Sequence, residues 1–463
     1  MKTLRLKYSI LKTLLSFALA LTISSCSDFI EVDDPITLLI RKDVFEDDLT
    51  AVAAVSGLYT SLAAQSGLNS ITYLTSLSSD EMKVEQGVEP LQFYRNAILS
   101  TNASVASIWT ESYSVIYKAN SIIEGLEKSS KITIPLKNQL LGEAKFFRAF
   151  HHLYLVNLFG AVPYVIETDY TKNELISRVA IADVYEKITT DLLAAKALLS
   201  DDYSYSQGTR VRVNKWAATA LLARVYLYRE DWLHAEEQAT TVIGKTVLYA
   251  LTVLDSVFLK NSSETIWQLI PPNLQKYTSE GNLFNRPSYS AGVATMSEEL
   301  FTAFEDNDNR KTKWVGIGNS GAQSWCYPLK YKETYNNGTG AEYSTVLRLA
   351  EQYLIRAEAR AKQDKLTGAN SAASDLNIVR IRAGLPNTTA ISKIDLLAAI
   401  QQEKKVELFT EWGHRWLDLK RTGQVNNILS SIKSGWDDTD VLFPIPLTEI
   451  QLNPNLKPQN DGY

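Results

Sequence analysis

The sequence contains two short patterns that could carry enzyme chemistry, and neither has the surroundings that this chemistry needs. The glycine pattern that binds dinucleotide phosphates matches Gly316, Gly318 and Gly321. It works only between a strand and a helix, and no helical periodicity follows it here. One E-x-x-H pair, Glu411 and His414, is present, whereas a di-iron bundle needs two such pairs and further glutamates. The sequence therefore predicts no cofactor at either place.

Other titratable residues are better explained by packing than by catalysis or metal binding. His151 and His152 are neighbours in a predicted helix, where adjacent side chains diverge and do not share a metal ion. Asp80 and Glu81 could be the two carboxylates of a glycosidase, but the two carboxyl groups of such a pair must lie about 5–10 Å apart across a cleft. Adjacency in the chain does not indicate that arrangement, so we expect no enzyme and no metal site. A stripe of glutamates, Glu403, Glu407 and Glu411, should pair with arginines of nearby helices, such as Arg356, Arg360 and Arg380.

The N-terminus has the layout of a bacterial secretory signal that ends in a modified cysteine. Basic residues precede the apolar stretch 14–23, which at ten residues is too short to span a bilayer. Ser24 and Ser25 lead to Cys26, and 23–26 resembles a lipobox, in which the cysteine becomes the acylated N-terminus. Several acyl chains on one residue give durable anchoring. We predict a signal peptide over 1–25, lipidation of Cys26 and an acidic tether over 26–43; the alternative is an ordinary signal peptide, with Cys26 available to bond Cys326.

The composition describes a globular protein and excludes one class of partner. Hydrophobic residues make up 45 % of the chain and charged residues 21 %, which is enough to form a large core. The net charge of −5 offers no basic surplus to phosphates, so no nucleic-acid partner is expected. The chain also holds 23 tyrosines and 9 tryptophans, residues that serve both as core and as surfaces for polar ligands.

Helical periodicity dominates both ends of the remaining chain, and the middle lacks it. Small residues four apart, Ala235 and Ala239, indicate close packing of the tetratricopeptide kind, in which helix pairs stack on their neighbours. The middle, about 246–345, should hold a few strands such as 264–270 and a short helix near 297–305. The tail over 431–463, rich in Pro and Asn, should lie extended over the surface. Helices are expected at 44–62, 104–127, 136–160, 181–200, 214–244 (broken near 229–231), 353–363, 371–386 and 395–423.

Several blocks of the sequence resemble, in the same order, those of the SusD/RagB family of outer-membrane nutrient-binding lipoproteins. The blocks are GEAKFFRAFHHLYLVNLFGAVPYV, NKWAATALLARVYLYREDWLHAEEQATTVI, RLAEQYLIRAEARAK, LNIVRIRAGLP, EKKVELFTEWGHRWLDLKRTG and the tail from Leu442. One departure is Trp412, an insertion-like substitution between the Glu and the Gly that the family more often places directly before this histidine. The resemblance implies one domain over 44–463. Its fold would be mainly α: a tetratricopeptide-like helical-repeat scaffold, about 44–245 and 346–430, with a loop-rich, partly β region, about 246–345, that carries the ligand face.

The resemblance also implies a function and a set of site residues. The protein would be tethered to the outer membrane through Cys26, facing the exterior, and would capture oligosaccharide without cleaving it. Its partner would be a SusC-like TonB-dependent transporter, and the acidic stretch after Cys26 resembles a surface-export signal. Sugar rings need flat apolar faces with polar groups nearby, and the family takes them from the loop after the first helix and from the irregular middle. The candidates here are Asp80, Glu81, Phe93, Tyr94, Arg95, Asn96, Tyr277, Phe284, Tyr289, Trp314 and Trp325, whereas Trp109 and Trp267 are expected in the core.

Three other functions stay open from the sequence. Some members of the family capture peptide, so a RagB-like peptide-binding lipoprotein is the main alternative. A lipid-anchored glycoside hydrolase would use loop acids such as Asp80 and Glu81. A repeat scaffold could also bind only other proteins, without any nutrient ligand.

Overall fold

The computed structural model describes residues 43–65, 70–272, 275–290 and 292–463. Residues 45–463 form one compact unit. The predicted signal peptide and Cys26 lie outside the described residues, as does the predicted tether apart from its last residue. No helix in the described part of the chain is long and apolar enough to cross a membrane.

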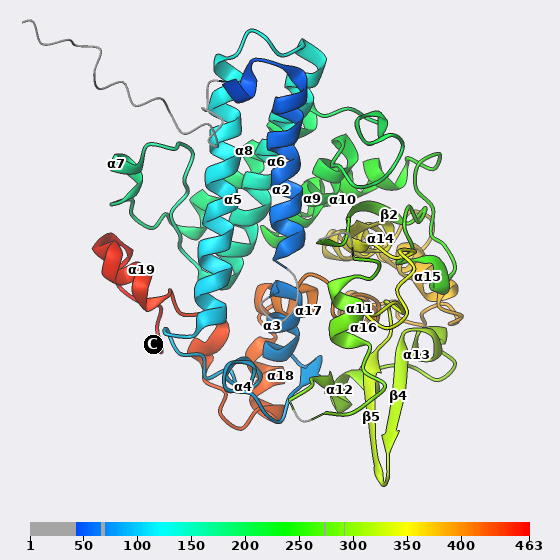
Figure 1. The fold of residues 1–463 in the computed structure, drawn as a ribbon. Helices are drawn as coiled ribbons and strands as arrows, with labels where there is room; N and C mark the ends of the chain where they lie inside the picture. The colour runs from blue at the N-terminus through cyan, green and yellow to red at the C-terminus, as the bar shows by residue number, and fades with distance from the viewer. Residues whose placement is uncertain (1–42, 66–69, 273–274, 291) are drawn as a thin grey trace, which may run out of the picture. The chain divides into compact units, whose positions relative to one another are not determined.

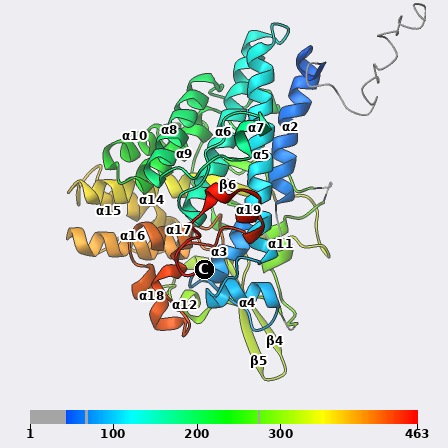
Figure 2. The ribbon, with the colours of Figure 1, turned by 90° about the vertical axis from the view of Figure 1, so that its left-hand side faces the viewer.

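The first half of this unit is a set of long helices packed side by side. The longest two, α5 (Ala103–Lys128) and α6 (Ile134–Phe159), lie against each other, and α2 (Asp48–Ala64) packs on both (Figures 1 and 2). Asn102 begins α5 by accepting hydrogen bonds from the backbone N–H groups of Ser104 and Val105. The other helices here are α3 (Ile71–Ser78), α4 (Val88–Arg95), α7 (Tyr170–Asn173), α8 (Ile181–Leu198), α9 (Lys215–Tyr228) and α10 (Trp232–Ile243).

The middle of the chain is irregular, and its described residues, with one strand from the loop after α3, form three small antiparallel pairs of strands. Strand β1 (Met82–Lys83) pairs with β3 (Thr295–Met296), and β2 (Thr265–Leu269) pairs with β6 (Ser344–Arg348). The third pair, β4 (Val315–Ser320) and β5 (Gln323–Pro328), is a hairpin that projects away from the helices (Figures 1 and 2). Short helices lie between them: α11 (Ser279–Phe284), α12 (Glu298–Phe301) and α13 (Asn309–Lys313).

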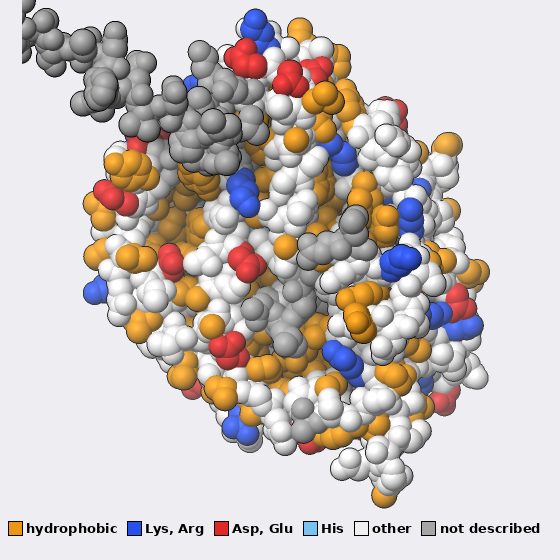
Figure 3. Space-filling model, in the orientation of Figure 1, with side chains coloured by type: hydrophobic (Ala, Val, Ile, Leu, Met, Phe, Trp, Pro, Cys, Tyr) orange, Lys and Arg blue, Asp and Glu red, His pale blue; other side chains and the backbone are white. Residues whose placement is uncertain are grey.

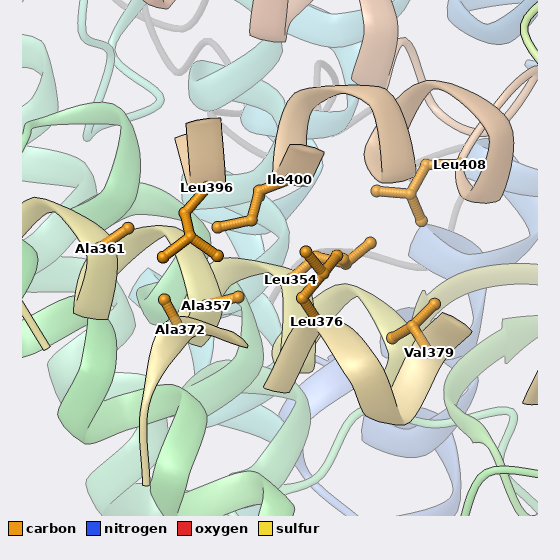
Figure 4. Packing of buried hydrophobic residues seen from close by; sticks show 9 residues of the cluster. All are labelled: Leu354, Ala357, Ala361, Ala372, Leu376, Val379, Leu396, Ile400 and Leu408. Atoms are coloured by element: carbon orange, nitrogen blue, oxygen red, sulfur yellow. The ribbon is translucent and has the colours of Figure 1, made fainter. Parts of the chain in front are cut away.

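The last third returns to helices that continue the stack. Helix α14 (Leu349–Lys362) packs on α10 as well as on α15 (Ala372–Arg382) and α16 (Lys393–Glu407). Their contact is a cluster of buried small and branched side chains, with Ala357 and Ala361 letting the helices approach closely (Figure 4). Its other members are Leu354, Ala372, Leu376, Val379, Leu396, Ile400 and Leu408. The chain ends with α17 (His414–Arg421), α18 (Val425–Ile432) and α19 (Leu447–Leu452).

The prediction of a mainly helical chain with a loop-rich, partly β middle is confirmed. Two details differ. The helix predicted over 395–423 is broken between α16 and α17, because Thr410, Trp412 and Gly413 all adopt positive φ angles. The tail does not simply cover the surface, since Phe443 and Ile445 are fully buried and α19 forms within it. Apolar side chains in the tail outweigh its Pro and Asn content, because they complete the core beside α6.

Candidate functional site

The glycines that match a dinucleotide pattern make room for aromatic rings in the β4–β5 hairpin. Gly316 lies opposite Tyr327 and Gly318 opposite Trp325 in the strand register. A Cβ atom on Gly318 would lie 2.3 Å from the indole ring of Trp325, and one on Gly316 would lie 2.2 Å from the ring of Tyr327. Each ring therefore lies flat across the opposite strand, where only glycine leaves space. The sequence motif reflects ring packing in a sheet.

Trp325 in turn supports an exposed tyrosine. The ring centroids of Tyr289 and Trp325 are 5.3 Å apart, and the indole N–H of Trp325 donates a 2.9 Å hydrogen bond to the backbone oxygen of Arg286. Trp325 is only 8 % exposed, whereas Tyr289 is 37 % exposed and open on one side. The hydroxyl of Tyr289 donates a 3.0 Å hydrogen bond to the carboxylate of Glu85. A flat ring with a carboxylate at its edge is the combination that a sugar ring and its hydroxyls require.

A shallow groove continues this surface along β1. The groove has a volume of about 220 Å³ and is lined by Lys83, Tyr94, Glu298 and Glu299, among others. Tyr94 is half-buried, and burial together with the nearby charges of Glu299 and Glu85 raises the pKa of its hydroxyl. Glu85 links the two parts of this surface, since it bonds to Tyr289 and its charge acts on Tyr94. We call this surface the hairpin face and define it as Lys83, Glu85, Tyr94, Tyr289 and Trp325.

The acidic candidates Asp80 and Glu81 lie beneath this face and are buried. Asp80 accepts two hydrogen bonds from the guanidinium of Arg415, at 2.7 and 2.8 Å, and its other cationic partner is Lys405 at 2.9 Å. Burial alone would raise the pKa of Asp80, but the bonds and charges of Arg415 and Lys405 hold it well below its usual range. In this conformation Asp80 joins the loop before β1 to α17, with its carboxylate held by these cations, and it also lines the groove.

Glu81 has a different environment, and its raised pKa predicts how the stability of the fold depends on pH. Burial, with the charge of Asp80 adding to it, raises the pKa of Glu81 to about 8. The folded state therefore holds a proton that the unfolded state releases, and stability falls as pH rises from about 4.5 to about 8. We expect Glu81→Gln to remove this fall and to be more stable than the wild type at pH 8 by about 2–4 kcal/mol, with a much smaller difference at pH 5. Urea unfolding at both pH values measures it; parallel pH profiles for the two proteins would show that Glu81 is not protonated in the fold.

The remaining candidates are mostly inside the molecule. Phe93 packs on Phe443, Phe284 lies against Tyr73, and the indole N–H of Trp314 bonds to the backbone oxygen of Leu254. Asn96 ends α4 in a left-handed conformation and accepts a 2.7 Å hydrogen bond from Lys433. These four side chains are at most 4 % exposed, so in this conformation they present no surface to a ligand. Arg95 is exposed, and Tyr277 is half-buried with its ring 6.2 Å from that of Tyr335.

The glutamate stripe forms the centre of a buried network of charges. Glu403 meets Arg380, as predicted, at 3.3 Å. The prediction was wrong for Arg356 and Arg360, which pair with Asp375 at 2.7 and 2.9 Å because α15 lies nearer to them. The other cations of the network are Arg310 and Lys330 from the irregular middle, Arg348 at the end of β6 and Arg382 at the end of α15.

The other sequence candidates have structural surroundings. Trp109 and Trp267 are buried, as predicted. His151 and His152 are buried in α6, and burial lowers the pKa of His151 to about 3 and that of His152 to about 4, so both rings are neutral. Within the described ranges, no group of three or more His, Cys, Asp or Glu residues could hold a metal ion. Cys326 is a half-buried free thiol.

Two residues of the hairpin face were missed from the sequence. Lys83 and Glu85 alternate with the buried Met82 and Val84, a period of two that indicates a strand with one exposed side. That alternation runs directly after Asp80 and Glu81 and was the available signal. It points Lys83 and Glu85 outward and Asp80 inward, whereas Glu81, which the alternation would place beside Lys83, is buried by its surroundings.

Comparisons with known proteins place the chain among carbohydrate-binding relatives. A family model described as starch-binding associating with outer membrane matches residues 28–227, and a model described as SusD family matches residues 278–463. SusD-like protein P2 of Formosa agariphila is 27 % identical over 507 aligned positions, covering 96 % of this chain and 98 % of its own. The starch-binding protein SusD of Bacteroides thetaiotaomicron is 24 % identical, covering 69 % of this chain and 72 % of its own.

Solved structures show the same fold. A laminarin-binding SusD-like protein superposes with a TM-score of 0.78 at 24 % identity, covering 90 % of this chain and all of its own. Surface glycan-binding protein A from Bacteroides fluxus gives a TM-score of 0.74 at 22 % identity, covering 89 % and 99 %. Both matches thus cover about nine-tenths of the chain.

Proposed function

Because the chain belongs to the SusD/RagB family of non-catalytic, outer-membrane-associated glycan-binding proteins, we propose that it captures oligosaccharide outside the cell on its hairpin face. It then passes the ligand to a SusC-like TonB-dependent transporter. The ligand face belongs to the region 246–345 of a single domain over 44–463, completed by the loop that carries Lys83 and Glu85 and by Tyr94 on α4.

The observation that carries this proposal is the meeting of Tyr289, Trp325 and Glu85 on one exposed surface. Tyr289 offers an open ring with little rotamer freedom to lose, and Tyr94 offers a second one along the groove. Trp325 supports Tyr289 from beneath, and Lys83 and Glu85 supply polar groups for hydroxyls. Seen from the side of Figure 3, acidic and basic side chains are scattered, without a continuous basic patch that would favour a polyanion.

Calorimetry with laminarin and starch oligosaccharides tests the ligand class. We expect saturable binding to one member of a glycan panel and a loss of about 1–3 kcal/mol for Tyr289→Ala, because a stacking ring is removed. Tyr170→Ala is the matched control, since Tyr170 is 75 % exposed on α7, outside the hairpin face. Oligopeptide binding without glycan binding would favour peptide capture instead, and equal affinity of both variants for the glycan would place its site elsewhere.

The membrane tether is a separate part of the proposal. Acylation of Cys26 would hold the protein on the outer membrane with its ligand face toward the exterior. We expect Cys26→Ser to move the protein from the membrane fraction to the soluble fraction while leaving its glycan affinity unchanged. Protease treatment of whole cells then reports whether the wild type is exposed. Membrane retention of the Cys26→Ser variant would overturn the lipid anchor.

A further inference from the structure

A pocket separate from the hairpin face lies where α2, α3, α5 and α11 meet. It is a narrow recess: the enclosed space measures about 40 Å³, and about 700 Å³ when the open solvent between its walls is included. Most of its wall is apolar, with Leu62 from α2, Ile108 from α5 and Pro271 and Pro272 after β2. Two carboxylates, those of Glu111 and Glu280, also line it. Neither lysine nor arginine stands among the described residues of the wall, so the charge of the pocket is negative.

The carboxylate of Glu280 is buried and only half satisfied. One of its oxygens accepts a hydrogen bond from the hydroxyl of Ser344, and the other, Oε2, has no hydrogen-bond partner. A buried carboxylate without a cation is unfavourable, and burial accordingly raises the pKa of Glu280. Several other buried glutamates pair with arginine or lysine, as Glu351 does with Arg224. Glu280 has no such cationic partner among the described residues.

The aromatic wall of the pocket is held in a strained backbone conformation. Trp412 has a φ angle of 44°, in the left-handed region that a bulky L-residue rarely adopts. Three contacts hold it there: its backbone N–H donates to Thr72, its backbone oxygen accepts from Tyr154, and its indole N–H donates to the backbone oxygen of Thr345. Such strain persists where the surroundings fix it, and it is concentrated at ligand sites. Here it sets an indole ring beside the pocket that Glu280 lines.

We propose that this pocket binds a primary alkylammonium group, such as the side chain of a lysine on a ligand. The ammonium would pair with Glu280, with the field of Glu111 adding to it, and the indole of Trp412 would offer a cation–π contact. The apolar wall suits the methylene chain that carries the charge. A metal ion fits less well, because the described residues bring no third His, Cys, Asp or Glu to the site and the wall is largely apolar.

An NMR titration of the whole protein with Nα-acetyl-lysine methylamide tests this site without any glycan. The matched probe is Nα-acetyl-norleucine methylamide, which has the same chain without the charge. We expect saturable shifts with the lysine probe only. We expect Glu280→Gln to weaken its binding by tenfold or more and Glu111→Gln to weaken it less. Glu298→Gln, an exposed acid beside the hairpin face, should leave it unchanged.

The same variants separate a binding role from a structural one. Glu280→Gln removes an unpaired buried charge, so its melting temperature should be equal to or above that of the wild type. A melting temperature lower by more than about 5 °C would make the carboxylate structural and overturn the proposal. Equal binding of the norleucine probe, or unchanged lysine affinity in Glu280→Gln, would overturn it too.

A second titration uses glucosamine oligomers, whose amino group is carried by a sugar ring. If these bind and the lysine probe does not, the proposal that the pocket takes an alkylammonium group is wrong. Because the hairpin face is not involved, failure of the glycan proposal leaves this result interpretable.

Discussion

Replacing Arg348 by methionine should lower the free energy of unfolding by about 3–5 kcal/mol, the largest change that we expect from a single substitution. Its guanidinium is 2 % exposed and bonds to Glu264 at 2.9 Å, Glu407 at 2.6 Å and Glu411 at 2.7 Å. Methionine fills a similar volume but leaves these carboxylates short of one positive charge in a place that water does not reach. The reason for the cost is the unpaired charge that remains, since the intact network itself contributes little net stability. Urea unfolding measures the effect as a shift of the midpoint at constant slope.

An exposed ion pair provides the control for Arg348→Met. Lys313 lies 2.7 Å from Asp255, with about half of each side chain exposed to water. Lys313→Met should therefore cost no more than about 1 kcal/mol. If Arg348→Met cost as little, the remaining cations, Arg310 and Arg382, would be sufficient for Glu407, and the network would not depend on a single arginine. A change in the urea slope would instead indicate that α16 and α17 separate before the rest unfolds.

The long helices could be predicted from the sequence because their signals are local. In α5 and α6 the apolar period and the end signals, Asn102 and Gly160, lie within the segments themselves. The break between α16 and α17 has no such signal, since the sequence there continues a helical pattern. Distant contacts impose it: Thr72 and Tyr154 bind the backbone of Trp412, which lies more than 250 residues away from either. Helix propensity is overridden by packing at this point.

The candidate site was predicted in part. As with the helices, the positions that depend on contacts between distant parts of the chain could not be predicted from the sequence. Tyr94, Tyr289 and Trp325 come together on one surface, while Asp80 and Glu81 turn inward. The charge partner of Asp80 is Arg415, which lies 335 residues further along the chain, and no residue near Asp80 in the sequence indicates this pairing. An acid in a loop suggests a ligand contact equally well whether or not an arginine from another element covers it. Resemblance to a family gives the neighbourhood of a site, and the packing of distant elements decides which side chains face outward.

The conformation of Trp325 provides a way to disrupt the hairpin face without removing any of its residues. Gly318→Val would place a Cβ atom 2.3 Å from the indole ring, so the ring has to leave the strand. Trp325 would then lose its hydrogen bond to Arg286 and its contact with Tyr289. We expect this variant to lose about 1–3 kcal/mol of stability, as overpacked sites do, and to bind the glycan about 10–100-fold more weakly, because Tyr289 no longer has a support.

Ile317 lies next to Gly318 on the other side of the same strand and is 60 % exposed, which makes Ile317→Thr the control for a change in β4 alone. It should leave both the melting temperature and the glycan affinity near their wild-type values. Tryptophan fluorescence adds an independent readout, since displacement of Trp325 toward water should shift the emission of Gly318→Val to longer wavelength and leave that of Ile317→Thr unchanged. If Gly318→Val shows the shift but keeps its affinity, Tyr289 holds its position without Trp325, through its hydrogen bond to Glu85. If it shows neither, the ring does not lie on Gly318, and the explanation of the glycine pattern is wrong.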